Sequence, residues 1–178
     1  SGAAFKEKLK EAKIPYIDLG YFGTIESLKK QALLVGKIIG EEGNAQALVR
    51  TIDSKIQELR GKIPAMDKPK RVLYYDEGGY VPGESSNFQS ICNIIRVVNV
   101  GTERGITSWS QIDHEILLKW NPDIIIVSEG NDLKERLMAN EILSHAKAIK
   151  SGKVYGVPGC YLNGHSQYVV LSANLLAG

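Results

Sequence analysis

Residues 109–128, WSQIDHEILLKWNPDIIIVS, predict in succession a helix, an abrupt stop and a buried strand. A helix is expected over 110–120, because Ile112, Ile116 and Trp120 recur at the spacing that places them on one inward face. The Asn-Pro pair ends this helix, since a residue before proline avoids helical dihedrals. The following DIIIVS is a continuous run of branched apolar residues, which is typical of a strand buried on both faces of a parallel sheet.

The start of this helix carries two residues that the apolar pattern does not explain. Ser110 is a natural N-cap, and Asp113 three residues later gives a start resembling a capping box. Glu115 lies off the apolar face and is expected to point to solvent. Either Glu115 is an ordinary surface residue and Trp109 packs at the helix entrance, or the unit binds a ligand at one end and a partner on its outer surface.

The same strand pattern recurs on both sides of this stretch. RVLYYD (71–76) and KVYGV (153–157) are further short apolar runs, and VVNV (97–100) is a weaker fourth. Strands that alternate with helices predict an α/β fold with a parallel sheet flanked by helices. The other helical stretches of this part are expected over 85–96, 131–148 and 165–177.

The first third of the chain has a different pattern. A helix is predicted over 3–12, followed by a short strand over 14–19, where apolar residues alternate around Pro15. Thr24 is a plausible N-cap for a helix over 24–42, and a second helix with a clean apolar stripe follows over 44–62. One isolated strand cannot form a stable sheet. The chain is therefore divided into 1–23, a helical connector over 24–63, and an α/β unit over 64–178.

Composition excludes several classes of function. The 178 residues include 22 basic and 20 acidic ones, a net charge of +2 that makes no case for nucleic acid or an acidic membrane as partner. The chain has no apolar run near the roughly 18 to 20 residues that span a bilayer. Cys92 and Cys160 have no zinc-type spacing, so no metal site is predicted, and both a disulfide and two buried free thiols remain open. The polar opening SGAAFKEKLKEAKIP suggests that the natural N-terminus lies upstream.

An ordered set of segments carries a family resemblance. SWSQIDHEILLKWNPDIIIVSEG (108–130) resembles the second-lobe signature of the bilobal substrate-binding proteins of metal-chelate ABC importers. Residues 14–63 resemble the last strand of their first lobe and the helix joining the lobes. KPKRVLYYDEG (68–78) and AIKSGKVYGVPG (148–159) resemble second-lobe strands. IIRVVNVG (94–101) departs from the pattern, since the family usually has a small glycine-rich turn there.

The resemblance implies a fold and a function. The chain would be the C-terminal lobe of a bilobal binding protein, with a long interlobe helix and a remnant of the N-terminal lobe. It would bind an iron-siderophore, haem or cobalamin-type metal chelate in the interlobe cleft and deliver it to an ABC permease at the inner membrane. It would be no enzyme and hold no resident cofactor. The protein would be located in the periplasm, or it would be lipid-anchored on the outer face of the cytoplasmic membrane.

The resemblance also assigns residues. Trp109 matches the family's aromatic ligand position, and Tyr80, Tyr161 and Asn163 lie in loops expected at the same strand ends, where open α/β sheets bind ligands. Glu115 matches an exposed glutamate that pairs with arginine on the permease. Each has an ordinary alternative: packing for the aromatic residues, turn chemistry for Asn163, and solvation for Glu115. His165 is either a metal ligand or a surface residue.

Two other functional classes stay open at this point. An enzyme on a related doubly wound fold, such as a metal chelatase, is the first alternative. GGYVPGESS (78–86) is glycine-rich but lacks the closing Lys-Ser/Thr of a phosphate-binding loop, and no catalytic residues are predicted. A receiver-like or purely interacting α/β domain is the second, and only Asp76 and Glu77 represent the acidic cluster that it requires.

Overall fold

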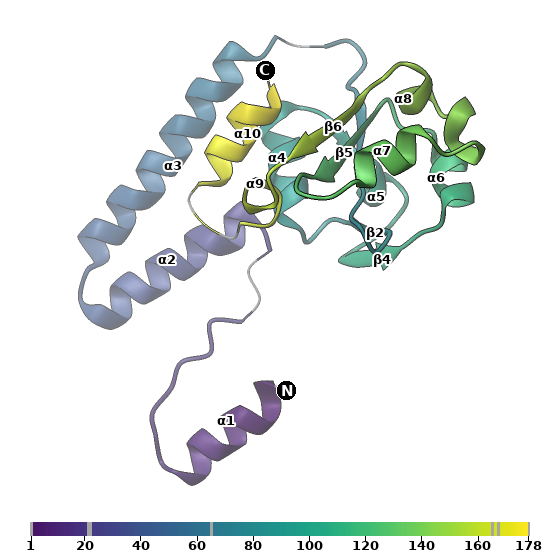
Figure 1. Cartoon of the computed structure of the whole chain (residues 1–178). Coiled ribbons are helices and arrows are strands. Elements are labelled where there is room, and N and C mark those ends of the chain that lie inside the picture. Colours follow the sequence, from purple (N-terminus) through teal and green to yellow (C-terminus); the bar gives the residue numbers. More distant parts are fainter. Residues whose placement is uncertain (1, 21–22, 65, 165, 167, 178) are drawn as a thin grey trace.

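Figure 1 shows the computed structural model, which describes residues 2–20, 23–64, 66–164, 166 and 168–177. An α/β body occupies one side, two long helices lie along it, and the first helix stands apart. The body is built on a four-stranded sheet in the order β3-β1-β5-β6, in which every neighbouring pair is parallel. This confirms the predicted parallel sheet. Its strands are β1 (Arg71–Tyr74), β3 (Val98–Asn99), β5 (Ile124–Ser128) and β6 (Val154–Val157).

Both faces of the sheet are covered, which explains the uninterrupted apolar strands. Successive side chains of a strand point to opposite faces, and β1 divides accordingly. Leu73 belongs to a core cluster with α6 (His114–Trp120), α7 (Leu133–Met138), η1 (Ile142–His145) and α8 (Lys147–Lys150). Val72 and Tyr74 belong to a second cluster with α4 (Asn87–Ile95) and α9 (Gly159–Asn163). The last helix, α10 (Val169–Ala177), packs on α4. A short helix, α5 (Val100–Glu103), follows β3.

The helix predicted over 110–120 is wrong in its first turn. Trp109–Gln111 forms β4, which pairs antiparallel with β2 (Tyr80–Pro82) in a separate two-stranded ribbon. The helix begins at His114, and Asp113 rather than Ser110 is its N-cap, with Oδ1 accepting from the Ile116 N–H at 2.8 Å. A capping carboxylate satisfies an amide at the helix start, while β2 supplies partners for the backbone before it.

The rest of this helix is partly as predicted. Asn121 ends it at φ 47°, and its N–H donates to the Leu117 carbonyl. The inward stripe is corrected, because Ile116 is 36% exposed whereas Leu117 is fully buried. The later start leaves a helix of seven residues, which buries one side chain completely.

Two other sequence expectations are corrected. Residues 14–20 have no regular structure, although a strand was expected over 14–19. A strand needs a neighbour for its backbone groups, and Figure 1 shows this segment running alone between α1 (Gly2–Glu11) and the long helices. The helix expected over 131–148 is broken into α7, η1 and α8. Asn140 lies at the first break, where its side chain accepts from the Leu143 N–H at 3.2 Å.

The connector helices are confirmed as α2 (Ile25–Ile39) and α3 (Glu42–Lys62). Thr24 caps α2 as predicted, because its side chain accepts from the Ser27 N–H. At 1.5 Å per residue, the 21 residues of α3 span about 32 Å. Its apolar residues Ile52, Ile56 and Leu59 are buried in one cluster with α4 and α10. The division at 23 and 63 stays a prediction.

Candidate functional site

The carboxyl ends of the sheet strands are joined by a small polar cluster. Tyr74 ends β1 and Ser128 ends β5, and their hydroxyl oxygens are 3.0 Å apart. Asn163, at the end of α9 beyond β6, donates from Nδ2 to the Tyr74 hydroxyl at 3.3 Å. Because parallel strands end at one edge, residues far apart in the chain meet there. This edge is the expected position of a ligand site.

Trp109 lies on this edge. Its ring centroid is 5.8 Å from that of Tyr74, with an angle of 78° between the ring planes. Edge-to-face pairs of this kind are favourable, and Trp109 is nevertheless 39% exposed. The indole thus packs on Tyr74 from a strand rather than at a helix entrance, and it still presents surface to solvent. Its role as a ligand contact stays a prediction.

The ribbon β2–β4 presents Tyr80 beside Trp109. In its register Tyr80 is opposite Gln111 and Pro82 is opposite Trp109, so alternation places Tyr80 and Trp109 on the same ribbon face. Val81 points the other way and is fully buried in the sheet core. Tyr80 is 43% exposed. We call Tyr80, Trp109, Ser128 and Asn163, together with the buried Tyr74 beneath them, the strand-end surface.

Tyr161 lies on the same short helix as Asn163 but faces different surroundings. It lines an apolar hollow of about 680 Å³ between the sheet, α4 and α10. It also packs on the core cluster that contains Phe88 and Leu162. The described residues that line this hollow include neither Tyr80 nor Trp109. The structure therefore links Trp109 and Asn163 through Tyr74, places Tyr80 on the same ribbon face as Trp109, and sets Tyr161 at the apolar hollow.

The two cysteines are both free thiols. Cys92 is buried on α4 and lines the apolar hollow, whereas Cys160 is exposed on α9. Burial raises the pKa of the Cys92 thiol far above its ordinary value. The disulfide left open by the sequence is absent between these two described residues, and only one of the thiols is buried.

Glu115 and His165 are the other residues for which the sequence suggested a role. Glu115 is exposed in the first turn of α6, as expected for a residue off the apolar face. His165 lies outside the described residues. Within the part of the chain that the structure describes, His, Cys, Asp and Glu form no group of three that could hold a metal ion.

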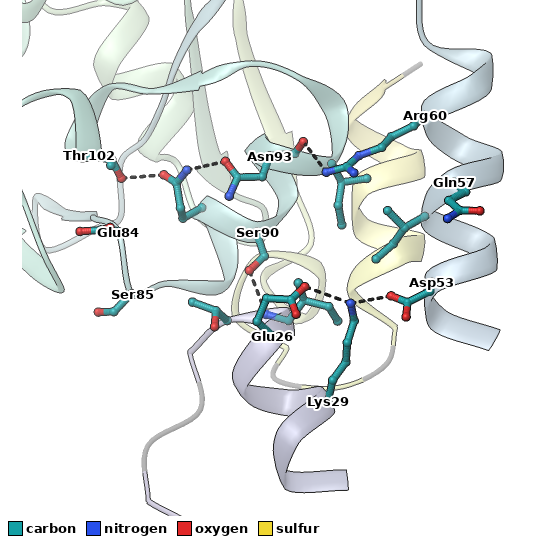
Figure 2. A pocket seen from close by; sticks show the side chains of 15 residues that line it. Glu26, Lys29, Asp53, Gln57, Arg60, Glu84, Ser85, Ser90, Asn93 and Thr102 are labelled. Carbon is teal, nitrogen blue, oxygen red and sulfur yellow. Dashed lines mark hydrogen bonds and ion pairs between the residues drawn. The ribbon is translucent and has the colours of Figure 1, made fainter. Parts of the chain in front are cut away.

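Sequence reasoning missed a second hollow, shown in Figure 2. Its volume is about 720 Å³, and it lies between α2, α3 and α4 with a largely polar lining. Lys29 pairs across it with Glu26 at 2.9 Å and Asp53 at 2.5 Å. Burial alone lowers the pKa of Lys29, but the hydrogen bonds to the two carboxylates outweigh it and raise that pKa. The buried Ser90 hydroxyl accepts from the Ile25 N–H at 3.0 Å and ties α2 to α4.

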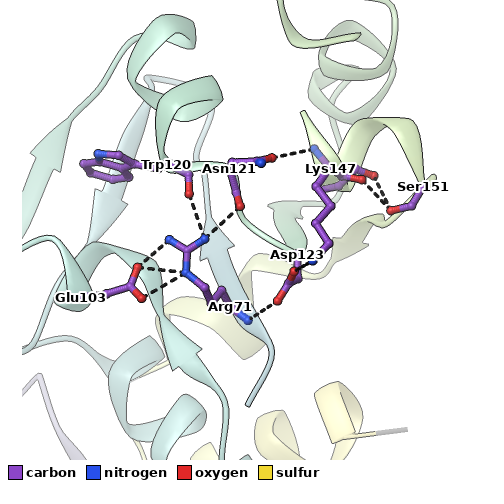
Figure 3. Close-up of polar contacts among 8 residues, drawn as sticks. Arg71, Glu103, Trp120, Asn121, Asp123, Lys147 and Ser151 are labelled. Carbon is purple, nitrogen blue, oxygen red and sulfur yellow. Dashed lines mark hydrogen bonds and ion pairs between the residues drawn. The ribbon is translucent and has the colours of Figure 1, made fainter. Parts of the chain in front are cut away.

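A polar network at the opposite, amino-terminal edge of the sheet is structural (Figure 3). The Arg71 guanidinium forms an ion pair with Glu103 at 2.6 Å. It also donates to the carbonyl oxygens of Trp120 and Asn121, both at 2.9 Å. Asp123 accepts from the Arg71 backbone N–H at 2.9 Å and pairs with Lys147. These contacts join the start of β1 to the ends of α5 and α6, at the sheet edge opposite the strand-end surface.

Comparisons with known proteins agree with this architecture. A family model described as periplasmic binding protein matches residues 3–160. An uncharacterized ABC transporter substrate-binding lipoprotein of Bacillus subtilis, YvrC, is 24% identical over 156 residues, covering 85% of this chain and 49% of that protein. The ferric-anguibactin-binding protein FatB of Vibrio anguillarum is 23% identical over 163 residues, covering 84% of this chain and 51% of that protein. The chain thus spans about half the length of the curated relatives it matches.

Solved structures show the same fold. A possible iron-binding (periplasmic solute-binding) protein from Staphylococcus epidermidis superposes with a TM-score of 0.85 at 18% identity, covering 99% of this chain and 70% of that one. The periplasmic heme-binding protein RhuT from Roseiflexus superposes with a TM-score of 0.79 at 15% identity, covering 97% and 68%. In the described part of the chain, none of the helices has the length and hydropathy to cross a membrane.

Proposed function

The chain belongs to the periplasmic binding protein family, and from this premise we propose that it is part of the substrate-binding component of an ABC importer. The proposed ligand is a metal chelate of the iron-siderophore, haem or cobalamin type. It would be bound at the strand-end surface and handed to a permease at the inner membrane. The protein would act in the periplasm or be lipid-anchored on the outer face of the cytoplasmic membrane.

One structural observation is the main support for the proposed ligand site. Trp109 packs edge-to-face on Tyr74 and stays 39% exposed at the carboxyl edge of the sheet. An aromatic side chain held in this way offers contact area to a rigid ligand at a small cost in conformational entropy. Tyr80 and Asn163 are the proposed neighbours of the ligand there. We keep Tyr161 as a contact for the part of a ligand that reaches the apolar hollow.

Glu115 is the proposed contact with the permease. It is exposed in the first turn of α6. Exposed charges of this kind set the orientation and rate of association more than its affinity. Replacing Glu115 by Arg is therefore expected to reduce import while the ligand affinity is unchanged. Normal uptake through this variant would remove Glu115 from the docking role.

The enzyme alternative receives no support from the family match, because the family is one of binding proteins. A chelatase would have to bring catalytic groups to a substrate. The strand-end surface instead combines aromatic rings with hydroxyl and amide groups. We therefore propose binding without catalysis.

Tryptophan fluorescence tests the proposal directly, because the chain has only Trp109 and Trp120. Ferric siderophores, haem and cobalamin are titrated into the protein, and quenching by at least one of them is expected. Quenching should survive in Trp120→Phe and disappear in Trp109→Phe, which form a matched pair. The proposal fails if none of the chelates binds up to about 1 mM, where the binding free energy is about −4 kcal/mol. It also fails if a chelate is chemically turned over.

A further inference from the structure

Two carboxylates follow the strand ends and have no part in the ligand site predicted from the sequence. Asp76 follows Tyr74 by two residues, and Glu129 directly follows Ser128. The strands that precede them, β1 and β5, are hydrogen-bonded neighbours, with Tyr74 opposite Ile126. The two acidic side chains therefore leave the sheet at the same edge as the Trp109–Tyr74 pair.

The whole carboxyl edge is acidic, although the chain as a whole has a net charge of +2. Four segments lead away from the strand ends and the ribbon, namely 75–88, 105–113, 129–132 and 158–164, and they contain no Lys or Arg. Their acidic residues are Asp76, Glu77, Glu84, Asp113, Glu129 and Asp132. Glu84 lines the polar hollow between α2, α3 and α4, and the other five acidic residues give the segments around the proposed ligand site an excess of negative charge.

Some of these acids are already committed to other contacts. Arg136 on α7 lies 3.1 Å from Asp132 and 3.6 Å from Glu77, so it compensates that pair. Asp113 caps α6. Asp76 accepts from the Tyr80 backbone N–H at 2.7 Å, which ties its carboxylate to the start of β2.

Glu129 lies beside Gly156 of β6 and also lines the apolar hollow. It is exposed, and it forms no ion pair with a described residue. Lys134 shares a hollow with it and is the nearest candidate for compensation. Acidic residues outnumber basic residues at the carboxyl edge of the sheet even when Lys134 and Arg136 are counted.

The aromatic residues of the surface favour the same sign of ligand charge. The faces of Trp and Tyr rings attract cations such as ammonium groups. Trp109 and Tyr80 are both partly exposed and lie on one ribbon face. Carboxylates beside aromatic faces form a surface that attracts positive charge and repels polyanions, most strongly at low salt.

We propose that this surface selects metal chelates that carry a positive charge, such as an exposed ammonium group, over polyanionic chelates. Asp76 and Glu129 are its specificity-determining residues. The inference rests on the proposed function, because it names the class of chelate that the same site binds. A ferric tris-hydroxamate with a free ammonium tail fits this class, whereas a ferric tris-catecholate does not.

The experiment compares two chelates of nearly the same shape that differ in charge, and a third that is polyanionic. The Trp120→Phe protein, with Trp109 as its reporter, is titrated with a ferric tris-hydroxamate bearing a free ammonium group, with its N-acetylated neutral form, and with a ferric tris-catecholate. The ammonium form is expected to bind best. Its advantage over the acetylated form should shrink as salt rises from low to physiological ionic strength.

Substitutions then assign the preference to residues. Glu129→Gln and Asp76→Asn are each expected to reduce the preference for the ammonium form about 1.5- to 5-fold, which is the range for exposed charge pairs. Glu42→Gln is the control, because Glu42 is an exposed carboxylate at the start of α3. It should leave the preference unchanged. Glu129→Gln keeps the test valid if loss of the Asp76 hydrogen bond disturbs the ribbon.

The two proposals fail in different ways. Equal binding of all three chelates, or tightest binding of the catecholate, overturns the charge preference and leaves the importer function standing. An ammonium preference that both substitutions leave intact overturns the role of Asp76 and Glu129. Failure of every chelate to bind overturns the function and the inference together.

Discussion

Gly83 offers a sharp test of how the ribbon is fixed to the body. A Cβ at this position would lie 2.7 Å from Ile106 Cγ2 and closer still to the Ile106 carbonyl group. The clash involves backbone and cannot be relieved by rotating a side chain. The same close approach carries hydrogen bonds from the Glu84 N–H to the Ile106 carbonyl at 2.9 Å and from the Ser85 N–H to the Thr107 carbonyl at 2.7 Å. Gly83→Ala must therefore separate the segment that follows β2 from the segment that leads into β4.

The expected cost is that of overpacking, about 1–3 kcal/mol. For a chain of this size that loss lowers Tm by about 2–12 °C. Thermal unfolding followed by circular dichroism measures it, and Trp109 fluorescence should shift in the folded variant because its packing on Tyr74 is disturbed. Ligand binding at the strand-end surface should weaken together with this shift.

A matched glycine substitution serves as the control. A Cβ at Gly61, near the end of α3, meets nothing within 4 Å. Gly61→Ala should stabilise the protein by about 0.5–1 kcal/mol, since alanine is the better helix former. If Gly83→Ala unfolds at or above the temperature of the unmodified protein, the close approach does not hold the ribbon and our reasoning about its position is wrong.

Three further predictions concern the body. Leu117→Ala removes the fully buried side chain of α6 and should cost about 2–5 kcal/mol in urea unfolding; a cost under about 1 kcal/mol would contradict its place in the core. The hydrogen bonds from Arg71 hold the pKa of Glu103 below its usual value. The pair therefore contributes its full stability above the unfolded-state pKa of Glu103, and this contribution is lost as the pH falls through the lower folded-state pKa. Arg71→Met should therefore flatten the acid limb of the stability curve, and an unchanged limb would show that the pair contributes nothing there. Cys160 should react with a thiol reagent in the folded protein and Cys92 only after unfolding, as mass spectrometry of the labelled protein would report; equal labelling rates would contradict their different burial.

Much of the fold could be predicted because its signals are local. The run Ile124–Val127 is apolar at every position, which is typical of a strand covered on both faces. Thr24 and Asn121 mark a helix start and a helix end through their own backbone and side-chain chemistry. The exposure of Glu115 follows from its position off the apolar face of α6.

The candidate site could be predicted only as a set of residue types. The sequence pointed to Trp109, Tyr80 and Asn163 through a resemblance, and no local pattern indicated that they would meet. The pairing of β2 with β4 turned Trp109 from a helix-entrance residue into a ribbon residue that packs on Tyr74. A three-residue strand is too short to show a period, so this pairing left no readable signal.

Patterns along the chain thus determined the four strands of the main sheet, most helices and the parallel class of that sheet, because each follows from side chains within a few residues of one another. Folding in three dimensions decided that Tyr74, Ser128 and Asn163 share hydrogen bonds and that Tyr161 faces a separate hollow. It also placed the unassigned carboxylates Asp76 and Glu129 at one edge. The physical reason is that parallel strands end together, so residues separated by dozens of positions become neighbours through crossovers that no local spacing encodes.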